Sequence, residues 1–141
     1  MIAIDTNLLV YAHRAGASEH RSAQAAIERA AASSQGWGFT VANINEFWRV
    51  VTEPRMPQPS SGNQAYAFIL ELIEGARARV WYPKTGFAER LLQAASDLDI
   101  RGARIFDLHI GLCARENGAT HLWTRDARFI EIAGLEVVNP F

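Results

Sequence analysis

The residues that could do chemistry in this sequence are four acids: Asp5, Glu46, Asp107 and Asp126. Asp5 and Asp126 each follow a short apolar run that has the character of a buried strand. An open parallel sheet binds its ligands beyond the carboxyl ends of its strands, so both carboxylates are expected at one site. Each aspartate could instead cap the N-terminus of the helix that follows it, which is a favoured role for this residue type.

Asp107 and Glu46 occur in segments with the periodicity of helices. The helix around Asp107 is apolar on most sides, and a carboxylate there must be paired, protonated or bound to a metal. Arg104 offers a purely structural ion pair as the alternative. Glu46 adjoins Phe47 and Trp48, which gives the same argument with less force, because an isolated glutamate is usually solvated.

A cluster of these acids would need a cation. Two ionised carboxylates about 5 Å apart repel each other by about 3 kcal/mol at an effective dielectric of 20. Mg²⁺ and Mn²⁺ prefer oxygen ligands and keep bound waters that can act as nucleophiles. Zinc is disfavoured, because the four histidines have no matching cysteine set and no HExxH spacing occurs.

The elements that must position these acids alternate between strands and helices. Apolar runs at Ile2–Ile4, Val80–Tyr82, His121–Trp123 and Leu135–Val138 predict strands. Helical spacing predicts helices from about Ser18 to Ser33, Val41 to Glu53, Asn63 to Glu74, Gly86 to Leu98 and Ile105 to Ala114, with one more directly after Asp5 and a short one from Thr124 that contains Phe129 and Ile130. The proline-rich segment Pro54–Gly62 predicts a loop. This alternation indicates an α/β fold with a parallel sheet between layers of helices, formed by one domain over residues 1–141.

Composition narrows the class of protein. The chain has 141 residues, 49% of them hydrophobic, and a formal net charge of -1, so any binding of a polyanion must be local. Of the 14 basic residues all except Lys84 are arginine, which suits phosphate contacts but also follows from GC-rich coding. Cys113 is the single cysteine and is expected to be a buried hydrophobic residue. With no membrane-length apolar stretch and Asp5 interrupting any signal-peptide pattern, we expect a cytoplasmic protein.

Several motifs, in their order and spacing, resemble those of one known family. They are Ile4-Asp5-Thr6-Asn7 with Leu9, Tyr11 and Ala12, then Asn45-Glu46-Phe47, the segment Arg104–Gly111 around Asp107, Gly118-Ala119-Thr120, the run Leu122–Asp126 with Phe129, and Gly134-Leu135 through Asn139-Pro140. On these residues the chain resembles the PIN-domain nucleases, and specifically the VapC-type toxins of toxin-antitoxin pairs. The resemblance covers nearly the whole chain.

The resemblance implies a PIN-like αβα sandwich with a mainly parallel central sheet. It implies an acidic pocket of Asp5, Glu46, Asp107 and Asp126, with Thr6 and Thr124 as supporting hydroxyls. It further implies an Mg²⁺-dependent endoribonuclease, with Mn²⁺ as substitute, that cuts structured RNA such as tRNA or ribosomal RNA, forms a homodimer and is inhibited by a VapB-type antitoxin. Arg104 and Arg125 adjoin the acidic motifs and are candidates for RNA phosphate contacts, or for local ion pairs.

Two other functions are weighed against this one. A haloacid-dehalogenase-like phosphatase would use an aspartate after the first strand, such as Asp5, as a nucleophile. Its second aspartate would stand at position 7, where this chain has Asn7. A non-catalytic PIN-like module that binds RNA or a partner is the other alternative, and the full set of acids argues against it.

Overall fold

The computed structural model describes residues 1–141 as five strands and six helices. In chain order they are β1 (Ile2–Ile4), α1 (Thr6–His13), α2 (His20–Ala32), β2 (Trp37–Thr40), α3 (Val41–Val51), α4 (Gly62–Glu74), β3 (Arg79–Trp81), α5 (Phe87–Asp97), α6 (Arg104–Glu116), β4 (His121–Trp123) and β5 (Glu136–Val138).

The five strands form one sheet in the order β3-β2-β1-β4-β5, and every neighbouring pair is parallel. Ile2 in the central strand is in register with Trp37 of β2 on one side and His121 of β4 on the other. The chain adds β2 and β3 on one side of β1 and then crosses to add β4 and β5 on the other. This reversal places a switch point at β1, the position where ligands bind in open α/β sheets.

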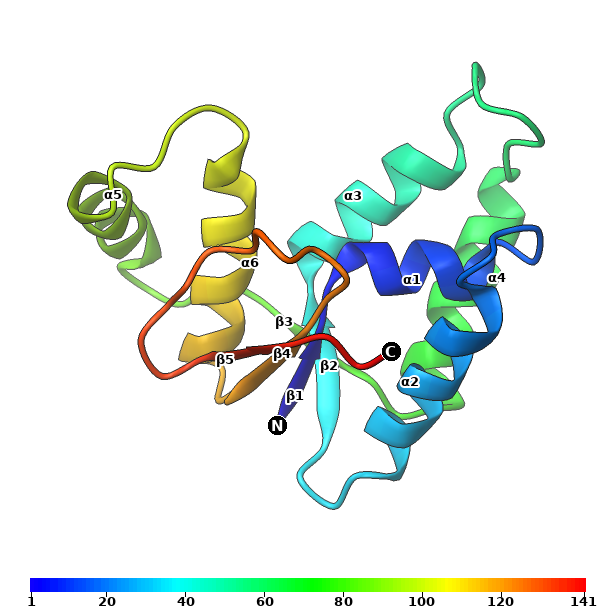
Figure 1. Ribbon diagram of the computed structural model, residues 1–141, viewed down its shortest axis with the longest axis horizontal. Coiled ribbons are helices and arrows are strands. Elements are labelled where there is room, and N and C mark those ends of the chain that lie inside the picture. Colours follow the sequence, from blue (N-terminus) through cyan, green and yellow to red (C-terminus); the bar gives the residue numbers. More distant parts are fainter.

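Helices cover both faces of the sheet (Figure 1), with α1 to α4 on one side and α5 and α6 on the other. Side chains along a strand alternate between faces, and the two apolar clusters follow this rule. Ile2 and Ile4 pack into the cluster under α1 to α4, whereas Ala3 between them joins the cluster under α6. The structure therefore is the three-layered α/β architecture expected from the sequence.

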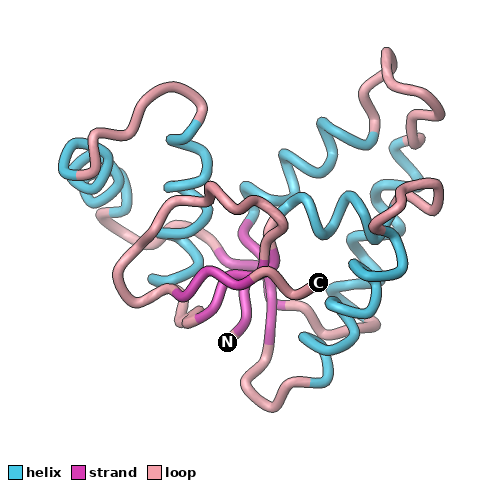
Figure 2. The backbone as a smooth tube through the Cα atoms, in the orientation of Figure 1, coloured by secondary structure: helices cyan, strands magenta, loops and turns pink.

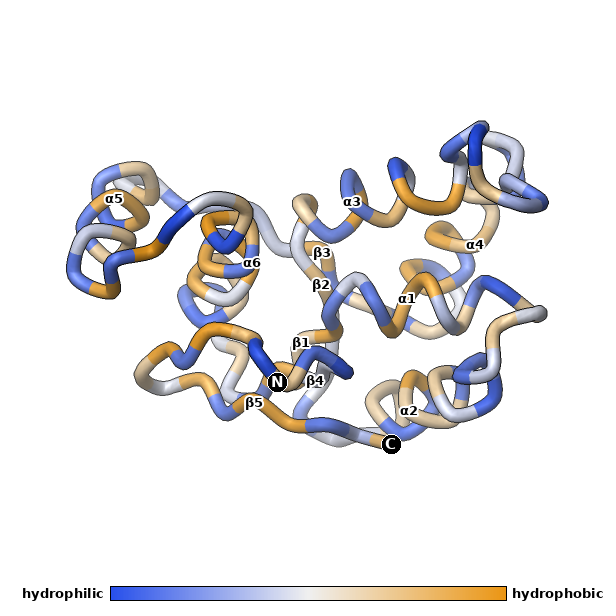
Figure 3. The backbone as a smooth tube through the Cα atoms, turned by 45° about the horizontal axis from the view of Figure 1, so that its top comes forward, coloured by the Kyte–Doolittle hydropathy of each residue, from blue (hydrophilic) through white to orange (hydrophobic).

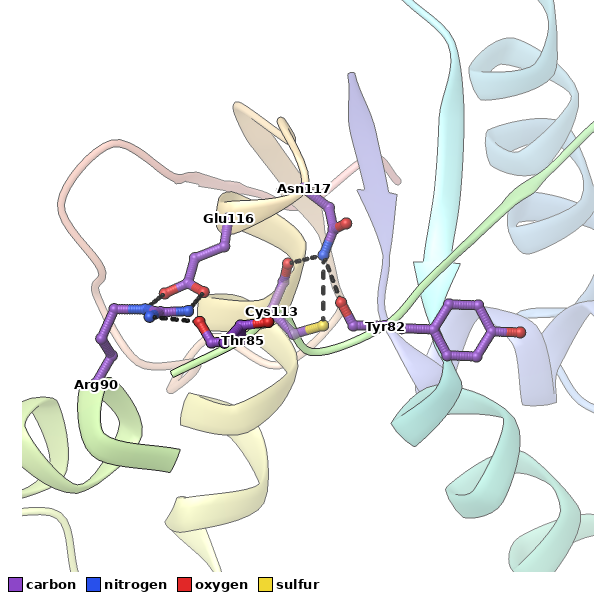
Figure 4. A network of polar contacts seen from close by, with 6 residues as sticks. All are labelled: Tyr82, Thr85, Arg90, Cys113, Glu116 and Asn117. Atoms are coloured by element: carbon purple, nitrogen blue, oxygen red, sulfur yellow. Dashed lines mark hydrogen bonds and ion pairs between the residues drawn. The ribbon is translucent and has the colours of Figure 1, made fainter. Parts of the chain in front are cut away.

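The outer helix α5 is fastened to α6 by polar contacts. Arg90 forms a two-pronged ion pair with Glu116, at 2.6 and 2.7 Å, and also donates to the Thr85 carbonyl at 3.0 Å. At the end of α6, the Asn117 amide donates to the carbonyls of Tyr82 and Cys113 (Figure 4). These contacts orient α6, the helix that carries Asp107.

Three features differ from the sequence-based expectations. Strand β2 was not predicted. The helix predicted from Thr124 is wrong, because the chain between β4 and β5 is a loop throughout (Figure 2). Phe106, expected on a helix buried nearly all round, is 66% exposed.

Cys113 is fully buried, as predicted. None of the helices has the length and apolar character needed to cross a membrane.

Candidate active site

The four acids lie on different elements that meet beyond the carboxyl ends of the central strands. Asp5 follows β1 and precedes α1, Asp126 lies in the loop after β4, Glu46 is on α3 and Asp107 is in the first turn of α6. Along α3, hydrophilic and hydrophobic residues alternate with the turns of the helix (Figure 3), so that one side packs into the core and the other is free. Glu46 is half-buried, as are Asp107 and Asp126.

Asp5 is the most buried of these acids, with 6% of its surface exposed. Its Oδ1 accepts a hydrogen bond from the Thr6 amide at 2.8 Å, which makes it the N-cap of α1. Its Oδ2 accepts from the Thr124 hydroxyl at 2.7 Å and from the Asn7 amide at 3.0 Å. Asp5 therefore caps a helix and also belongs to the acidic group, two roles that the sequence left as alternatives.

Burial raises the pKa of Asp5 from its ordinary 3.8 to about 6. The hydrogen bonds from Thr124 and Thr6 oppose this rise, and the charges of Glu46 and Asp107 add to it. Glu46 also has a raised pKa, through burial and then through the charge of Asp107. The pKa of Asp107 is raised by burial and by the charge of Asp126. Each acid is thus within electrostatic range of at least one other, and together they form a connected group.

The group is loosely assembled. No three of its carboxylates lie close enough to form a ready-made cage of protein ligands. Such an arrangement suits a small hard cation, because Mg²⁺ is usually bound through one or two carboxylates and keeps several waters. Two surface pockets of about 420 and 440 Å³ lie outside this group, one at the opposite edge of the sheet and one beside the start of α6.

Arginines do not neutralise the acids. Arg104, the structural partner considered for Asp107, donates instead to the Arg128 carbonyl at 3.1 Å, although its charge lowers the pKa of Asp107. The exposed Arg125 guanidinium lies over the Phe141 ring, 4.8 Å from its centroid. Only Asp126 has an arginine within ion-pair range, the exposed Arg128 at 3.8 Å. Negative charge therefore remains available for a cation.

Three polar residues to which the sequence analysis gave no supporting role contact the site: Asn7, Thr40 and Asn43. The Asn7 amide donates to Thr124 at 2.9 Å as well as to Asp5. Thr40 and Asn43 form the capping box of α3, and Asn43 also donates to Thr6 at 3.0 Å. The spacing of Thr40 and Asn43 is that of a capping box, a sequence signal that could have marked this pair.

Comparison with known proteins agrees with the fold. The family model described as PIN domain matches residues 2–135. Over 141 residues, 99% of this chain and 95% of the relative, the chain is 35% identical to VapC ribonuclease Mb2897 of Mycobacterium bovis. The same identity and coverage hold for Ribonuclease VapC43 of Mycobacterium tuberculosis.

Solved structures share the fold at lower sequence identity. VapC20 of Mycobacterium tuberculosis, described as a sarcin-ricin loop cleaving toxin, superposes with a TM-score of 0.69 at 17% identity, covering 92% of each chain. VapBC2 of Rickettsia felis, bound to a DNA fragment from its promoter, gives 0.67 at 20% identity, with 99% of this chain and 98% of that chain covered. FitAcB of Neisseria gonorrhoeae gives 0.62 at 18% with the same coverage. The chain belongs to the PIN-domain family, within its VapC-type group.

Proposed function

We propose that this protein is a metal-dependent endoribonuclease toxin that hydrolyses phosphodiester bonds in structured RNA. The observation that carries the proposal is the acidic group at the switch point of the sheet, whose members raise one another's pKa and are left largely without arginine partners. The 35% identity to proteins named VapC ribonuclease supports the same activity.

The residues present fit a hard divalent cation. Asp5 is buried with a raised pKa, so its ionised form is unfavourable unless positive charge is supplied nearby. The donor set consists of carboxylate oxygens, which Mg²⁺ and Mn²⁺ prefer. We assign Asp5, Asp107 and Asp126 as direct or water-mediated ligands, and Glu46 as a further ligand or as the group that orients the attacking water.

The chain's own residues prepare the reaction. A bound Mg²⁺ or Mn²⁺ would activate water and offset charge that develops on the phosphate. Asp5 is held by the Thr6 amide and by the hydroxyl of Thr124, so its carboxylate has a fixed orientation. Burial and the charge of Asp107 raise the pKa of Glu46, so positive charge from a bound cation would favour the ionised form that can accept a proton from water. Hydrolysis by water would leave a 5′-phosphate and a 3′-hydroxyl.

Substrate and partners follow from the family. We propose a tRNA or ribosomal RNA substrate, with the exposed side chains of Arg104 and Arg125 as phosphate contacts beside the acids. We also propose a homodimer and inhibition by a VapB-type antitoxin, in line with the fold shared with VapBC2. The haloacid-dehalogenase alternative loses support because Asn7 is occupied in orienting Asp5 and Thr124.

The test is RNA cleavage by the wild-type protein and by Asp107→Asn, in Mg²⁺, in Mn²⁺ and in EDTA. Cleavage that needs the metal and falls at least about 100-fold in Asp107→Asn, with RNA binding retained, supports the proposal. Glu74→Gln, which removes an exposed acid without an ion pair at the end of α4, is the matched control and should cut normally. Unchanged cleavage in Asp107→Asn would exclude its role, and phosphatase activity without RNA cleavage would favour the rival enzyme.

A further inference from the structure

A pocket of about 440 Å³ lies beside the start of α6, the end of the helix that carries Asp107. One wall is the connection between α5 and α6, and the other is part of the loop after β4. The same loop carries Asp126, and Figure 1 shows it passing alongside α6. The volume is within the range of about 300–1,000 Å³ that is usual for sites that bind small ligands.

The pocket adjoins the acidic group through Arg104. This residue lines the pocket and lies three residues before Asp107, so the two side chains occupy neighbouring positions on one face of α6. Its guanidinium donates to the Arg128 carbonyl at 3.1 Å, which fastens the start of α6 to the loop that carries Asp126. A ligand in the pocket would therefore lie next to the site of the proposed hydrolysis.

The lining suits a neutral group with apolar faces and polar edges. Three of the lining residues are aliphatic: Leu98, Ile100 and Ile130. Two arginines and two acids, Asp99 and Glu131, also line the pocket, so their formal charges cancel. An unstacked base of RNA has the matching character, with flat apolar faces and with hydrogen-bond donors and acceptors along its edges. Sequence-specific recognition of RNA is mostly directed at such bases in single-stranded loops and bulges.

We propose that this pocket binds one unpaired base of the RNA substrate, close to the phosphate that is cut. This role rests on the proposed function, because it concerns the substrate of the same site. The base packs on Leu98 and Ile100, and the neighbouring phosphate lies against Arg104. The Arg101 guanidinium is 81% exposed and pairs with the exposed Asp99 at 3.1 Å, a weak partner that leaves it available to stack on the base. Cleavage would then require an unpaired base at a fixed distance from the cut.

The test begins with an RNA that the wild-type protein cuts. Cleavage positions in total tRNA and ribosomal RNA are mapped in Mg²⁺ and in Mn²⁺, and a synthetic stem-loop is made around one of them. Single bases that flank the cut are then removed one at a time to give abasic substrates. At one position we expect the missing base to raise KM about tenfold with kcat within about twofold, because the contact is present both before and during hydrolysis.

A double-perturbation cycle between protein and RNA assigns that base to the pocket. Leu98→Ser changes a side chain that is 49% exposed, so the fold should be retained. This variant should raise KM about fivefold on the intact stem-loop and cause no further rise on the abasic one. If Leu98→Ser does not fold, Leu98→Ala takes its place, with a smaller rise that is again absent on the abasic RNA. Leu92→Ser, at an exposed leucine of α5 outside the pocket, is the matched control and should show the full effect of base removal.

The same cycle can be followed without cleavage, as the affinity of a labelled stem-loop for Asp107→Asn and for Asp107→Asn/Leu98→Ser, measured by fluorescence anisotropy. If the wild type cuts RNA but no flanking base affects KM, or if the losses from Leu98→Ser and from base removal are additive, the pocket does not hold the base. Normal cutting of both RNAs by Leu98→Ser would also overturn this role and would leave a partner protein as the occupant. A wild-type protein that cuts no RNA in either metal would overturn the proposed function, and the role of the pocket with it.

Discussion

The Thr124 hydroxyl donates a 2.7 Å hydrogen bond to Oδ2 of Asp5, although 119 residues separate the two in the chain. Thr124 is 2% exposed and also accepts from the Asn7 amide and from the Asp126 backbone N–H. One hydroxyl therefore connects Asp5 to the backbone of Asp126, the first and the last of the four acids in the group. Several measurable consequences follow from this and from the other contacts of the site.

Thr124→Val should destabilise the fold, because it keeps the shape of the side chain but removes one hydrogen bond each from Asp5, from the Asn7 amide and from the Asp126 backbone N–H. We expect a loss of about 2 kcal/mol in the free energy of unfolding, measured by urea denaturation. Thr124→Ser restores the hydroxyl and should recover most of that loss. Equal stability of the valine variant and the wild type would contradict the assigned hydrogen bonds.

The raised pKa of Asp5 predicts how stability depends on pH. Between 3.8 and about 6 the folded protein binds more protons at this group than the unfolded chain, so the contribution of Asp5 to stability falls as the pH rises through that window. The full shift corresponds to about 3 kcal/mol. In EDTA, the Tm of the wild type relative to Asp5→Asn should therefore rise as the pH is lowered from about 7.5 to 4.

Comparison with Asp5→Asn is needed because His13 and His109 act in the opposite direction. Burial lowers the pKa of both, so their contribution to stability is lost as the pH falls through the pKa of the unfolded histidines. The two histidines affect the Tm of the wild type and of Asp5→Asn equally, so their effect cancels when one Tm is subtracted from the other. Parallel curves of Tm against pH would show that Asp5 titrates normally.

Divalent cations should stabilise the wild-type fold. A ligand that binds only the folded state at 100 times its Kd adds about 2.7 kcal/mol, which a thermal shift with Mn²⁺ would detect. The double variant Asp5→Asn/Asp107→Asn should lose this shift, while Glu74→Gln should keep it. A shift of full size in the double variant would place the cation elsewhere on the protein.

Gly38 should tolerate no side chain. A Cβ at this position would lie 2.2 Å from the carbonyl oxygen of Arg79, in the strand that pairs with β2. Gly38→Ala must therefore push β2 and β3 apart, and we expect a loss of at least about 2 kcal/mol of stability. Gly16→Ala is the matched control, because nothing lies within 4 Å of its Cβ position. Similar Tm values for the two variants would contradict the tight pairing.

Most of the fold could be predicted because its elements have strong patterns. The periodicity of α3 and the apolar run of β1 are local properties that the chain keeps in the structure. Strand β2 was missed because it has only four residues and all of them are buried. One of the four, Gly38, has no side chain that could mark either face of the sheet. Such a run lacks the alternation that reveals a half-buried strand.

The helix predicted from Thr124 was wrong for a different reason. Thr124, Arg125 and Asp126 have the composition of a helix start, but the Thr124 hydroxyl accepts from the Asp126 amide at 3.0 Å, and Asp126 Oδ1 accepts from the Arg128 amide at 2.9 Å. These local bonds satisfy the backbone without a helix.

The candidate site could be predicted only in part. The four acids are recognisable because each stands out from apolar neighbours or follows a strand. The roles of Asn7 and Asn43 depend on partners that are distant in the chain, such as Thr124 and Thr6, so no local pattern reveals them. Packing of α1 against α3, together with the pairing of β1 with β4, brings these partners together.

The position of β4 in the sheet has a consequence for protein synthesis. Strand β1 is synthesised before its neighbour β4 and the loop with Asp126, which follow it by more than 100 residues. A nascent or prematurely terminated chain that ends before β4 lacks both Thr124 and Asp126. Under the proposed function, such a chain would lack part of the acidic group and should not cut RNA, so the order of the strands makes activity wait for the synthesis of β4 and the loop after it.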